Sequence, residues 1–442
     1  MNPGKPAQSA LSTADAFFVA YQQGAGILMQ QGFELELKGK LERADLEAML
    51  SHVTGRWPQL GQAVQRRIGG LVWQGECRVA EMLRVETGES GLQRWRNEPM
   101  DPFREPPFQI LWVRGEEREI LSVRGHHAVL DGEAMFTVYL EMLKVLANAK
   151  GGRPLPLPVA VMPARLAGLG ESLRPLCSGK MWSHLRKMSK EAKGGGSARM
   201  AVRNGAPGPT ATCERLLDAE ESRNLAEQAA RHGTQPLWFT TAAWMRALHA
   251  WNKAAGAGGN STISLEFPVS LRRGKVSKDC LGNLISPLML MGDAALPVGA
   301  LAQTLKEQFS HSIREQLHLT MPRFTAPLRF LPWAIFRRLV MTPLATGFAT
   351  SHFTWHENKN DVGSNVSDWS GGRLELLGRR VYTPVCLHMG VALLVVASAG
   401  ATQLSISHRL NAFSHDDAER LADLLQSELM QSSTELAEHD GK

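Results

Sequence analysis

The hydrophobic residues of this chain change repeatedly between the spacing of a strand and the spacing of a helix. Phe33–Leu37 alternates with a period of two, which is typical of a strand, whereas Arg43–Val53 places its apolar residues at helical spacing. Ile110–Val113 and Glu119–Val123 predict a pair of strands. From Gly132 onward, apolar residues recur in steps of three and four, which predicts an amphipathic helix that ends before a pair of glycines.

The second half of the chain shows the same mixture. Its predicted elements are helices at Asp218–Ala230, Trp238–Trp251 and His415–Met430, strands at Thr262–Val269 and Leu284–Met291, and a hairpin of Gly390–Ala397 with Gln403–His408. Strands and helices interleave without the regular rhythm of a doubly wound sheet. We therefore predict an α/β fold with mixed sheets and two lobes of similar size.

Length and composition limit the class of protein. The chain has 442 residues, of which 43% are hydrophobic and 21% charged, enough for two or three domains and a large core. These values exclude a disulfide scaffold, a coiled coil and a mainly disordered chain. The five cysteines lie far apart and form no CxxC pair, which favours reduced thiols in a cytoplasmic protein.

The sequence also bears on localisation. Met1–Phe18 has no long apolar core behind a positive start, so we expect no signal peptide. The longest apolar run, near Val391–Ala399, is far short of the ~20 residues that span a bilayer, and it is better explained as a buried strand. We expect a soluble cytoplasmic protein, or one at most peripheral to a membrane.

Basic residues gather in one stretch of a mildly basic chain. The net charge is +6, and residues 180–203 hold seven lysines and arginines against Glu191 alone. Such a cluster can bind nucleic acid, anionic lipid or a phosphorylated cofactor. Because the stretch is rich in glycine and runs into Asn204–Pro209, a solvated, flexible connector is the better interpretation. We predict an N-terminal lobe over residues 1–179, a connector over 180–212 and a C-terminal lobe over 213–442.

The segment Arg124–Gly132, between a predicted strand and a predicted helix, carries the sharpest chemical signal. A neutral imidazole takes a proton from an alcohol or amine, so His126 and His127 are candidates for a general base. Adjacent side chains of a strand-like segment point opposite ways, so one histidine should face a cavity and the other the protein. Asp131 could act on the imidazole, or it could pair with a distant cation and hold the loop. Gly132 leaves the backbone bare where a substrate or the next helix approaches.

The histidine pair has two other interpretations, a metal site and a purely structural pair. The usual zinc spacings, His-Glu-x-x-His and paired cysteines, are absent, so we expect no metal. From these residues alone, the structural and the catalytic interpretations are about evenly balanced.

The pattern HHxxxDG followed by a helix resembles the signature of the acyltransferase superfamily built on the chloramphenicol acetyltransferase fold. That superfamily includes the condensation domains of peptide synthetases, the wax ester synthase/diacylglycerol acyltransferases and the alcohol acetyltransferases. Four further segments resemble it: Arg56–Leu60 within 41–67, Phe267–Arg272, Leu281–Asn283 and Ser364–Val366. The Asp-Phe-Gly-Trp-Gly motif of the plant BAHD branch is absent, and Ser367-Asp368 replaces the Pro-Gly that follows Ser-Asn-Val in wax ester synthases.

The resemblance implies a fold and a reaction. It implies two chloramphenicol-acetyltransferase-like lobes that form a pseudo-dimer around a central tunnel, with His127 at its middle. His127 would be the general base for direct acyl transfer from a thioester, and His126 would be structural. Asp131 would pair with Arg272, or with Arg273 if the register is off by one, and so hold the loop.

The resemblance also suggests partners for the site. Ser364 and Asn365 are tentative substrate-binding residues, although a turn-forming Ser-Asn is at least as good an explanation. We expect no cofactor, because acyl-CoA or an acyl-carrier-protein thioester serves as co-substrate.

Four functions remain in competition. The leading one is an acyl-CoA-dependent O- or N-acyltransferase, and the second is a free-standing condensation enzyme that uses carrier-bound substrates. The third is a catalytically inactive binding member, which the intact set of His127, Asp131 and Arg272 disfavours. The fourth is a nucleic-acid-binding protein, for which the basic stretch lacks aromatic platforms.

One further stretch, Met321–Val340, is both basic and apolar. It could rest on a membrane surface, or it could pack between the lobes with its arginines in solvent. Packing is favoured, because Pro322, Pro327 and Pro332 break any long helix.

Overall fold

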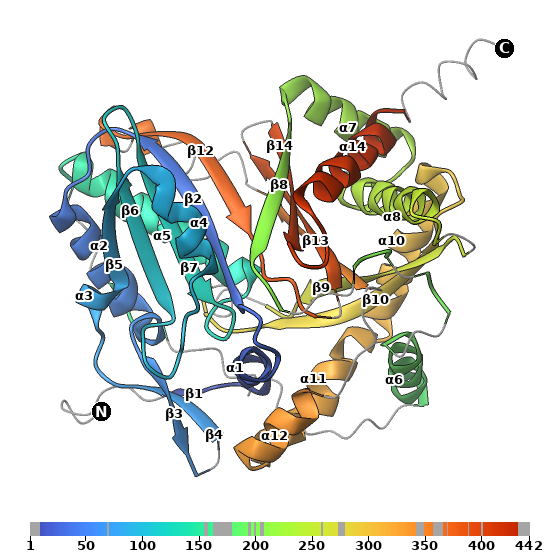
Figure 1. The fold of residues 1–442 in the computed structure, drawn as a ribbon, viewed down its shortest axis with the longest axis horizontal. Helices are drawn as coiled ribbons and strands as arrows, with labels where there is room; N and C mark the ends of the chain where they lie inside the picture. Colours follow the sequence, from blue (N-terminus) through green and yellow to red (C-terminus); the bar gives the residue numbers. More distant parts are fainter. Residues whose placement is uncertain are drawn as a thin grey trace.

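The structure is a computed structural model, and it describes most of the chain. The described residues are 9–68, 70–153, 158–161, 179–192, 196–198, 200–203, 207–257, 260–272, 279–341, 349–356, 366–368, 370–387, 389–398 and 401–431. They form two lobes side by side, each with a central sheet covered by helices on its outer side (Figure 1). A small third sheet lies below the first lobe in this view.

The first lobe is built on a five-stranded mixed sheet with the order β12-β2-β7-β6-β5, in which only β5 and β6 pair in parallel among the described strands. Helices α2 and α5 pack against each other over this sheet, and most of the large apolar residues of both helices are buried. Its elements are β2 (Gln30–Lys38), α2 (Arg43–Arg56), α3 (Val79–Met82), β5 (Leu83–Thr87), α4 (Leu92–Asn97), β6 (Phe108–Arg114), β7 (Glu119–His126), α5 (Gly132–Lys150) and β12 (Glu375–Tyr382).

The second lobe contains a six-stranded mixed sheet with the order β10-β9-β11-β13-β14-β8. Helix α8 is buried along much of its length and packs against α7, α10 and α14. The elements are β8 (Thr210–Leu217), α7 (Ala219–Arg231), α8 (Pro236–Ala254), β9 (Thr262–Ser270), β10 (Ile285–Asp293), α10 (Val298–Arg314), β11 (Ala349–His356), β13 (Met389–Ser398), β14 (Ala401–Arg409) and α14 (His415–Gln431).

The remaining strands and α-helices lie along the lower side of the molecule in Figure 1. They are β1 (Ser9–Ala10), α1 (Thr13–Ala25), the hairpin of β3 (Ala63–Arg67) and β4 (Gly70–Gln74), α6 (Gly179–Ala192), α11 (Thr320–Thr325) and α12 (Trp333–Val340). Short 3-10 turns occur at Pro58–Leu60 (η1), Glu89–Gly91 (η2), Leu317–Leu319 (η4) and Ala326–Phe330 (η5). No helix in the described ranges combines the length and apolarity needed to cross a bilayer.

The strands and helices predicted from hydrophobic spacing are present. Asp218 caps α7 as expected, since its carboxylate accepts from two backbone amides of the first turn. The two final strands pair as the predicted hairpin. Residues 321–340 form short helical pieces separated at prolines rather than one long helix, as the proline spacing predicted.

The predicted connector, residues 180–212, differs from the expectation of a solvated and flexible segment. Its first part is the helix α6, in which Met181 and Glu191 are buried. Further along, the Ala198 amide donates to the Thr262 carbonyl at 2.7 Å, and Met200 is buried in the second core. The composition is polar, but apolar residues recur at helical spacing within 179–192 and provide a packing face.

Strand β12 crosses from the second half of the chain into the sheet of the first lobe. Val381 pairs with Phe33 and Tyr382 with Gly32, and Val381 lies in the first core. A division of the chain at residues 180–212 therefore does not separate the two sheets completely. Hydrophobic spacing alone does not reveal such a crossing, because it says nothing about which strands pair.

Gly32 marks the place where β12, β2 and β7 meet. The Tyr382 hydroxyl passes over it and donates to the Val123 carbonyl at 3.3 Å. A Cβ atom at Gly32 would lie 2.0 Å from that carbonyl oxygen and 2.4 Å from the Tyr382 oxygen. We therefore expect Gly32→Ala to lower the free energy of unfolding by about 1–3 kcal/mol, because the added methyl displaces a strand or the tyrosine.

Chemical denaturation measures this loss. Gly179→Ala is the control, because a Cβ there meets nothing within 4 Å. Equal stability of the two variants would contradict the close approach at Gly32.

Candidate active site

The loop between β7 and α5 lies where the two lobes meet. His126 ends β7 and Gly132 begins α5, so residues 127–131 form the connection. On the first-lobe side, the His127 amide donates to the Met29 carbonyl at 2.7 Å. On the other side, Leu130 forms a bridge with Gly282, from the segment between β9 and β10 of the second lobe. The loop is thus held between backbone groups of both lobes.

Residues 279–284, which we call the clasp segment, contact the loop from the second lobe. The Gly282 amide donates to the Val129 carbonyl at 2.9 Å, and the Leu284 amide donates to Asp131 Oδ2 at 2.9 Å. Gly282 has a φ of 102°, which a residue with a Cβ rarely adopts. The Trp57 indole donates to the Asp279 carbonyl at 2.8 Å, so the first lobe also holds this segment.

Asp131 and Arg272 form the ion pair at the centre of the loop. Arg272 Nη1 lies 2.7 Å from Asp131 Oδ2, and the side chains are 1% and 0% exposed. The other oxygen of Asp131 accepts from the Ala134 amide at 2.8 Å and caps α5. Arg272 Nη2 donates to the Gly282 carbonyl at 3.1 Å. The pair therefore joins the start of α5, the end of β9 and the clasp segment.

His126 faces the protein. It is fully buried, and its Nδ1 accepts from the Ala128 amide at 3.0 Å, which places the proton of the neutral ring on Nε2. Burial, together with the neighbouring His127, lowers the pKa of His126 to about 3. This histidine stays neutral across the working pH range, so it holds the turn rather than exchanging protons.

His127 is half-buried between Phe18 and Asn283. The Phe18 ring stacks on the imidazole with centroids 3.8 Å apart and an interplanar angle of 12°. The Nδ1 atom lies 2.8 Å from Asn283 Oδ1. Both contacts fix the plane of the ring, and they come from α1 and from the clasp segment rather than from the loop itself.

The hydrogen bonds of Asn283 determine which nitrogen of His127 carries the proton. The Asn283 Nδ2 group donates to Asp15 Oδ1 at 2.9 Å and to the His127 carbonyl at 2.5 Å. Because both partners are acceptors, the amide oxygen must face the imidazole, and His127 Nδ1 must donate to it. The lone pair of the neutral ring is then on Nε2, which is the tautomer that a general base needs.

Burial lowers the pKa of His127. Its own backbone carbonyl, Asp131 and Asn283 each act to raise this pKa, but the effect of burial is larger. The imidazole is therefore neutral at neutral pH and ready to accept a proton. Burial also raises the pKa of Asp15, against hydrogen bonds from Asn283 and Ser12.

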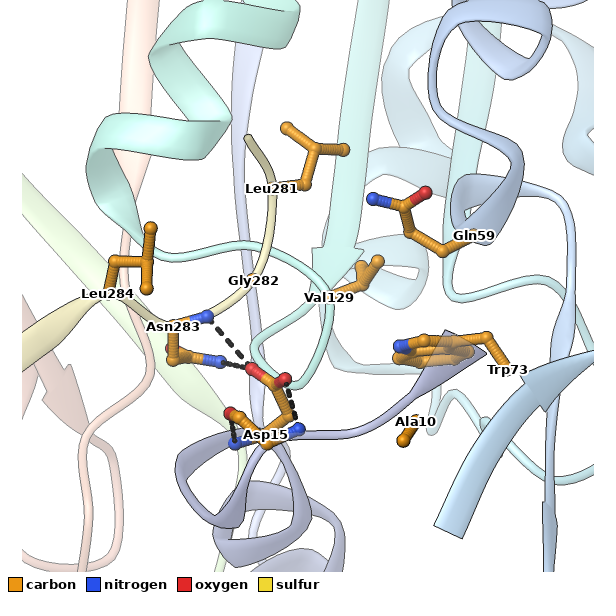
Figure 2. A pocket seen from close by; sticks show the side chains of 10 residues that line it. Ala10, Asp15, Gln59, Trp73, Val129, Leu281, Gly282, Asn283 and Leu284 are labelled. Carbon is orange, nitrogen blue, oxygen red and sulfur yellow. Dashed lines mark hydrogen bonds between the residues drawn. The ribbon is translucent and has the colours of Figure 1, made fainter. Parts of the chain in front are cut away.

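Asp15 lies in a pocket beside the loop, between the small sheet and the clasp segment (Figure 2). Its carboxylate points toward Asn283 and accepts from both the amide and the side chain of that residue. The pocket is lined by Ala10, Ser12, Asp15, Gln59, Trp73, Val129, Leu281, Gly282, Asn283 and Leu284. In the part of the chain that the structure describes, no cluster of three metal-ligating side chains occurs.

The structure brings together five of the residues predicted from sequence and adds three. His126, His127, Asp131, Gly132 and Arg272 all lie at this loop. Ser364 and Asn365 lie outside the described residues, as does Arg273. The residues that sequence analysis did not assign to the site are Asp15, Phe18 and Asn283. Asp15 carries a visible signal, the Ser12-x-x-Asp15 capping box, but that signal indicates only the start of a helix.

Comparison with known structures tests the fold. The first condensation domain of the calcium-dependent antibiotic synthetase, in complex with a substrate analogue, superimposes with a TM-score of 0.70 and 16% identity, over 96% of this chain and 95% of that one. The fold is that of a condensation domain. The predicted α/β class with two lobes and mixed sheets is confirmed.

Two other structures are similar over nearly their full length. The starter condensation domain of rhizomide synthetase, solved as a variant in complex with C8-CoA, gives a TM-score of 0.70 at 15% identity, over 96% of this chain and 95% of that one. SgcC5 from Streptomyces globisporus, in complex with a naphthyl ethanediol and sucrose, gives 0.60 at 16% identity, over 95% and 98%. No family model and no curated protein matches the sequence.

The buried ion pair predicts a coupled loss of stability. Asp131→Ala and Arg272→Ala should each lower the free energy of unfolding by about 3–5 kcal/mol, because each leaves one buried charge without its partner. The double variant should lose less than the sum of the two, since it leaves neither charge alone. Chemical denaturation of the four proteins measures the coupling.

A surface pair provides the control for this cycle. Lys38 and Glu375 lie 3.4 Å apart with most of both side chains in solvent, so Glu375→Ala should cost at most about 1 kcal/mol. Strictly additive losses at Asp131 and Arg272 would contradict the coupling.

The contact with Asn283 predicts the pH dependence of His127. Because the pKa of His127 is lowered, activity should fall only at a pH below 6.5, as the imidazole takes up a proton. Asn283→Asp places a carboxylate beside Nδ1, which stabilises the imidazolium, so the acidic limb of the kcat/KM profile should move to higher pH. The measurement is kcat/KM as a function of pH, in the assay that tests the proposed function.

Asn260→Asp is the control, because it makes the same chemical change in an exposed loop. It should leave the acidic limb of the kcat/KM profile in place. An unshifted limb in a folded Asn283→Asp variant would show that Asn283 does not govern the protonation of His127.

Proposed function

We propose that this chain is an acyltransferase in which His127 removes the proton of a hydroxyl or amine acceptor that attacks an acyl thioester. The observation that carries the proposal is the tautomer of His127, whose Nδ1 donates to Asn283 and whose Nε2 is left with a lone pair. The ring is held in a fixed plane by Phe18, so this lone pair has a defined direction.

The proposed reaction proceeds in two stages. Nε2 takes the proton from the acceptor while the acceptor oxygen or nitrogen bonds to the thioester carbonyl carbon. The tetrahedral intermediate then collapses, the C–S bond breaks, and the imidazolium returns its proton to the departing sulfur. Throughout, Nδ1–H keeps its bond to Asn283, and no covalent bond forms between the acyl group and the enzyme.

The positive charge that develops on His127 needs little movement of the protein. Asp131 and the backbone carbonyl of His127 both favour the charged ring, and Asn283 accepts from Nδ1 in both states. The Asp131 carboxylate already pairs with Arg272, so its task is to hold the loop rather than to receive the proton.

The donor that best fits the proposal is an acyl-CoA. The similar starter condensation domain was solved with C8-CoA. Ser364 and Asn365 remain proposed contacts of the substrate, and a tunnel between the lobes remains an expectation from the resemblance. The wax ester synthase and alcohol acetyltransferase branches also remain expectations from the resemblance.

A free-standing condensation enzyme with carrier-bound substrates is the second candidate. It is favoured by the likeness, over nearly their full length, to condensation domains of the calcium-dependent antibiotic synthetase and of the Monacolin K polyketide synthase. Both candidates share the chemistry at His127 and differ in the group that bears the thioester.

A thiol-release assay tests the proposal. Acyl-CoAs of different chain lengths and acylated carrier proteins are offered with pooled alcohols and amines, and free thiol and ester or amide product are measured. His127→Ala should lower turnover at least about a hundredfold, because general-base catalysis contributes roughly 10²–10⁴. His311→Ala, at an exposed position of α10, is the matched control and should leave turnover unchanged.

The kind of thioester that releases thiol distinguishes the two candidate functions. Thiol release from acyl-CoA supports the first, and release from carrier-bound thioesters alone supports the second. A folded His127→Ala variant with near-wild-type transfer would refute the general base in both.

A further inference from the structure

Large apolar side chains are exposed on elements that lie along the lower side of the molecule in Figure 1. They come from the turn after β3, from α11 and η5, and from α12. Their exposed fractions are 108% for Ile68, 43% for Phe324, 66% for Phe330, 50% for Ile335 and 47% for Leu339. We call the surface formed by these five residues the docking face.

Contacts between the elements show that much of the docking face is one continuous surface. Arg66 on β3 lies over the ring of Trp333 on α12, 6.0 Å from its centroid, and over Phe103 at 5.2 Å. Gly70 is the first residue of β4. A Cβ atom added there would lie 3.9 Å from the carbonyl oxygen of Arg329 in η5. The hairpin that carries Ile68 therefore abuts the segment that carries Phe330, Ile335 and Leu339.

Helix α12 has more apolar surface than its packing requires. Trp333, Phe336 and Val340 face the protein, and Phe336 is buried. Ile335 and Leu339 lie one turn apart on the opposite side and are half exposed. A helix that only packs on a core has one apolar stripe, so the second stripe is available for a partner.

The charged residues on β3, α11, η5 and α12, which carry the docking face, are all arginines. Arg67, Arg329, Arg337 and Arg338 are exposed, and within the described ranges none of them forms an ion pair with a carboxylate. The sequence contains no aspartate or glutamate between Glu315 and Glu357. Exposed apolar groups surrounded by arginines form a surface that attracts an apolar partner with negative charge at its rim.

We propose that the docking face binds the surface of an anionic lipid bilayer. The apolar side chains stand on separate elements, and a bilayer accommodates separate protrusions because lipid packs around each of them. The arginines adjoin the apolar residues in sequence, and the Arg329 guanidinium lies 4.6 Å from the Phe330 ring centroid, so charged groups reach headgroups while apolar ones enter the acyl layer.

The position of the docking face gives this binding a consequence for the site. Val340 and Met341, at the end of α12, pack against the cluster that contains Tyr21 and Ala25 of α1. The same helix α1 carries Phe18, which stacks on His127. A bilayer at the docking face would lie against α12, which packs on the helix that borders the candidate base, and it would supply apolar donors or acceptors dissolved in lipid.

Flotation with vesicles tests the proposal on the full chain. The protein should float with vesicles of phosphatidylcholine and phosphatidylglycerol, and much less with phosphatidylcholine alone or at high salt. The triple variant Arg329→Gln, Arg337→Gln and Arg338→Gln should weaken partitioning about a hundredfold, since each arginine near the surface contributes about fivefold. The triple variant Phe330→Ser, Ile335→Ser and Leu339→Ser should weaken it at least about tenfold.

The control removes exposed apolar groups elsewhere. Leu216 on β8 and Leu377 on β12 are 67% and 47% exposed and lie away from the docking face, so Leu216→Ser with Leu377→Ser should float like the wild type. Circular dichroism checks that each variant is folded. Turnover of a short, water-soluble thioester should be the same in all four proteins, which separates a failure of docking from a failure of the proposed reaction.

Three results would overturn the proposal. The first is no flotation with anionic vesicles, and the second is equal flotation of the folded wild type and both triple variants. The third is a different occupant, shown by a dimer in solution or by a complex with an acidic carrier protein that the same substitutions abolish while vesicles do not bind.

Discussion

The buried ion pair of Asp131 and Arg272 is the constraint on which the candidate site depends. A carboxylate with no exposure cannot be left uncompensated, so the chain must bring an arginine to it from 141 positions away (272 − 131). Once the pair forms, the start of α5, the end of β9 and the clasp segment have a fixed relation. The position of His127 follows from that relation, because the loop that carries it has no freedom to move separately.

The histidine itself is controlled by a second set of contacts, which arrive from two different parts of the chain. Asp15 orients the amide of Asn283, and Asn283 in turn orients the imidazole and selects its tautomer. Without Asp15 the amide could rotate by half a turn and present its NH₂ group to Nδ1, and the ring would then place its lone pair on the wrong nitrogen. A carboxylate that never touches a substrate can thus decide whether the base is usable.

How much of this was predictable depends on the range of the interaction. The strand, the loop and the helix around HHxxxDG were predictable because hydrophobic spacing and capping act over a few residues. The meeting of Asp131 and Arg272 came only from a resemblance, since spacing says nothing about contacts across more than a hundred residues. Phe18 and Asp15 lie in a segment that reads as an ordinary helix start, so nothing local marks them as part of a site. The flexible connector was mispredicted over α6 because a polar composition hid a helical packing face.

The crossing of β12 has a consequence for how the chain is made. Phe33 of β2 pairs with Val381 of β12, so the first sheet stays one strand short until almost the whole protein has left the ribosome. During that time the edge of β2 presents unpaired amides and carbonyls next to a row of apolar side chains, which is a template for pairing with other chains. For most of the time that synthesis takes, the nascent chain is therefore open to aggregation at this edge. The pairing of β12 with β2 ends that period, and it is slow because the two strands are far apart in the sequence. A truncated chain that stops before residue 375 would retain the open edge permanently.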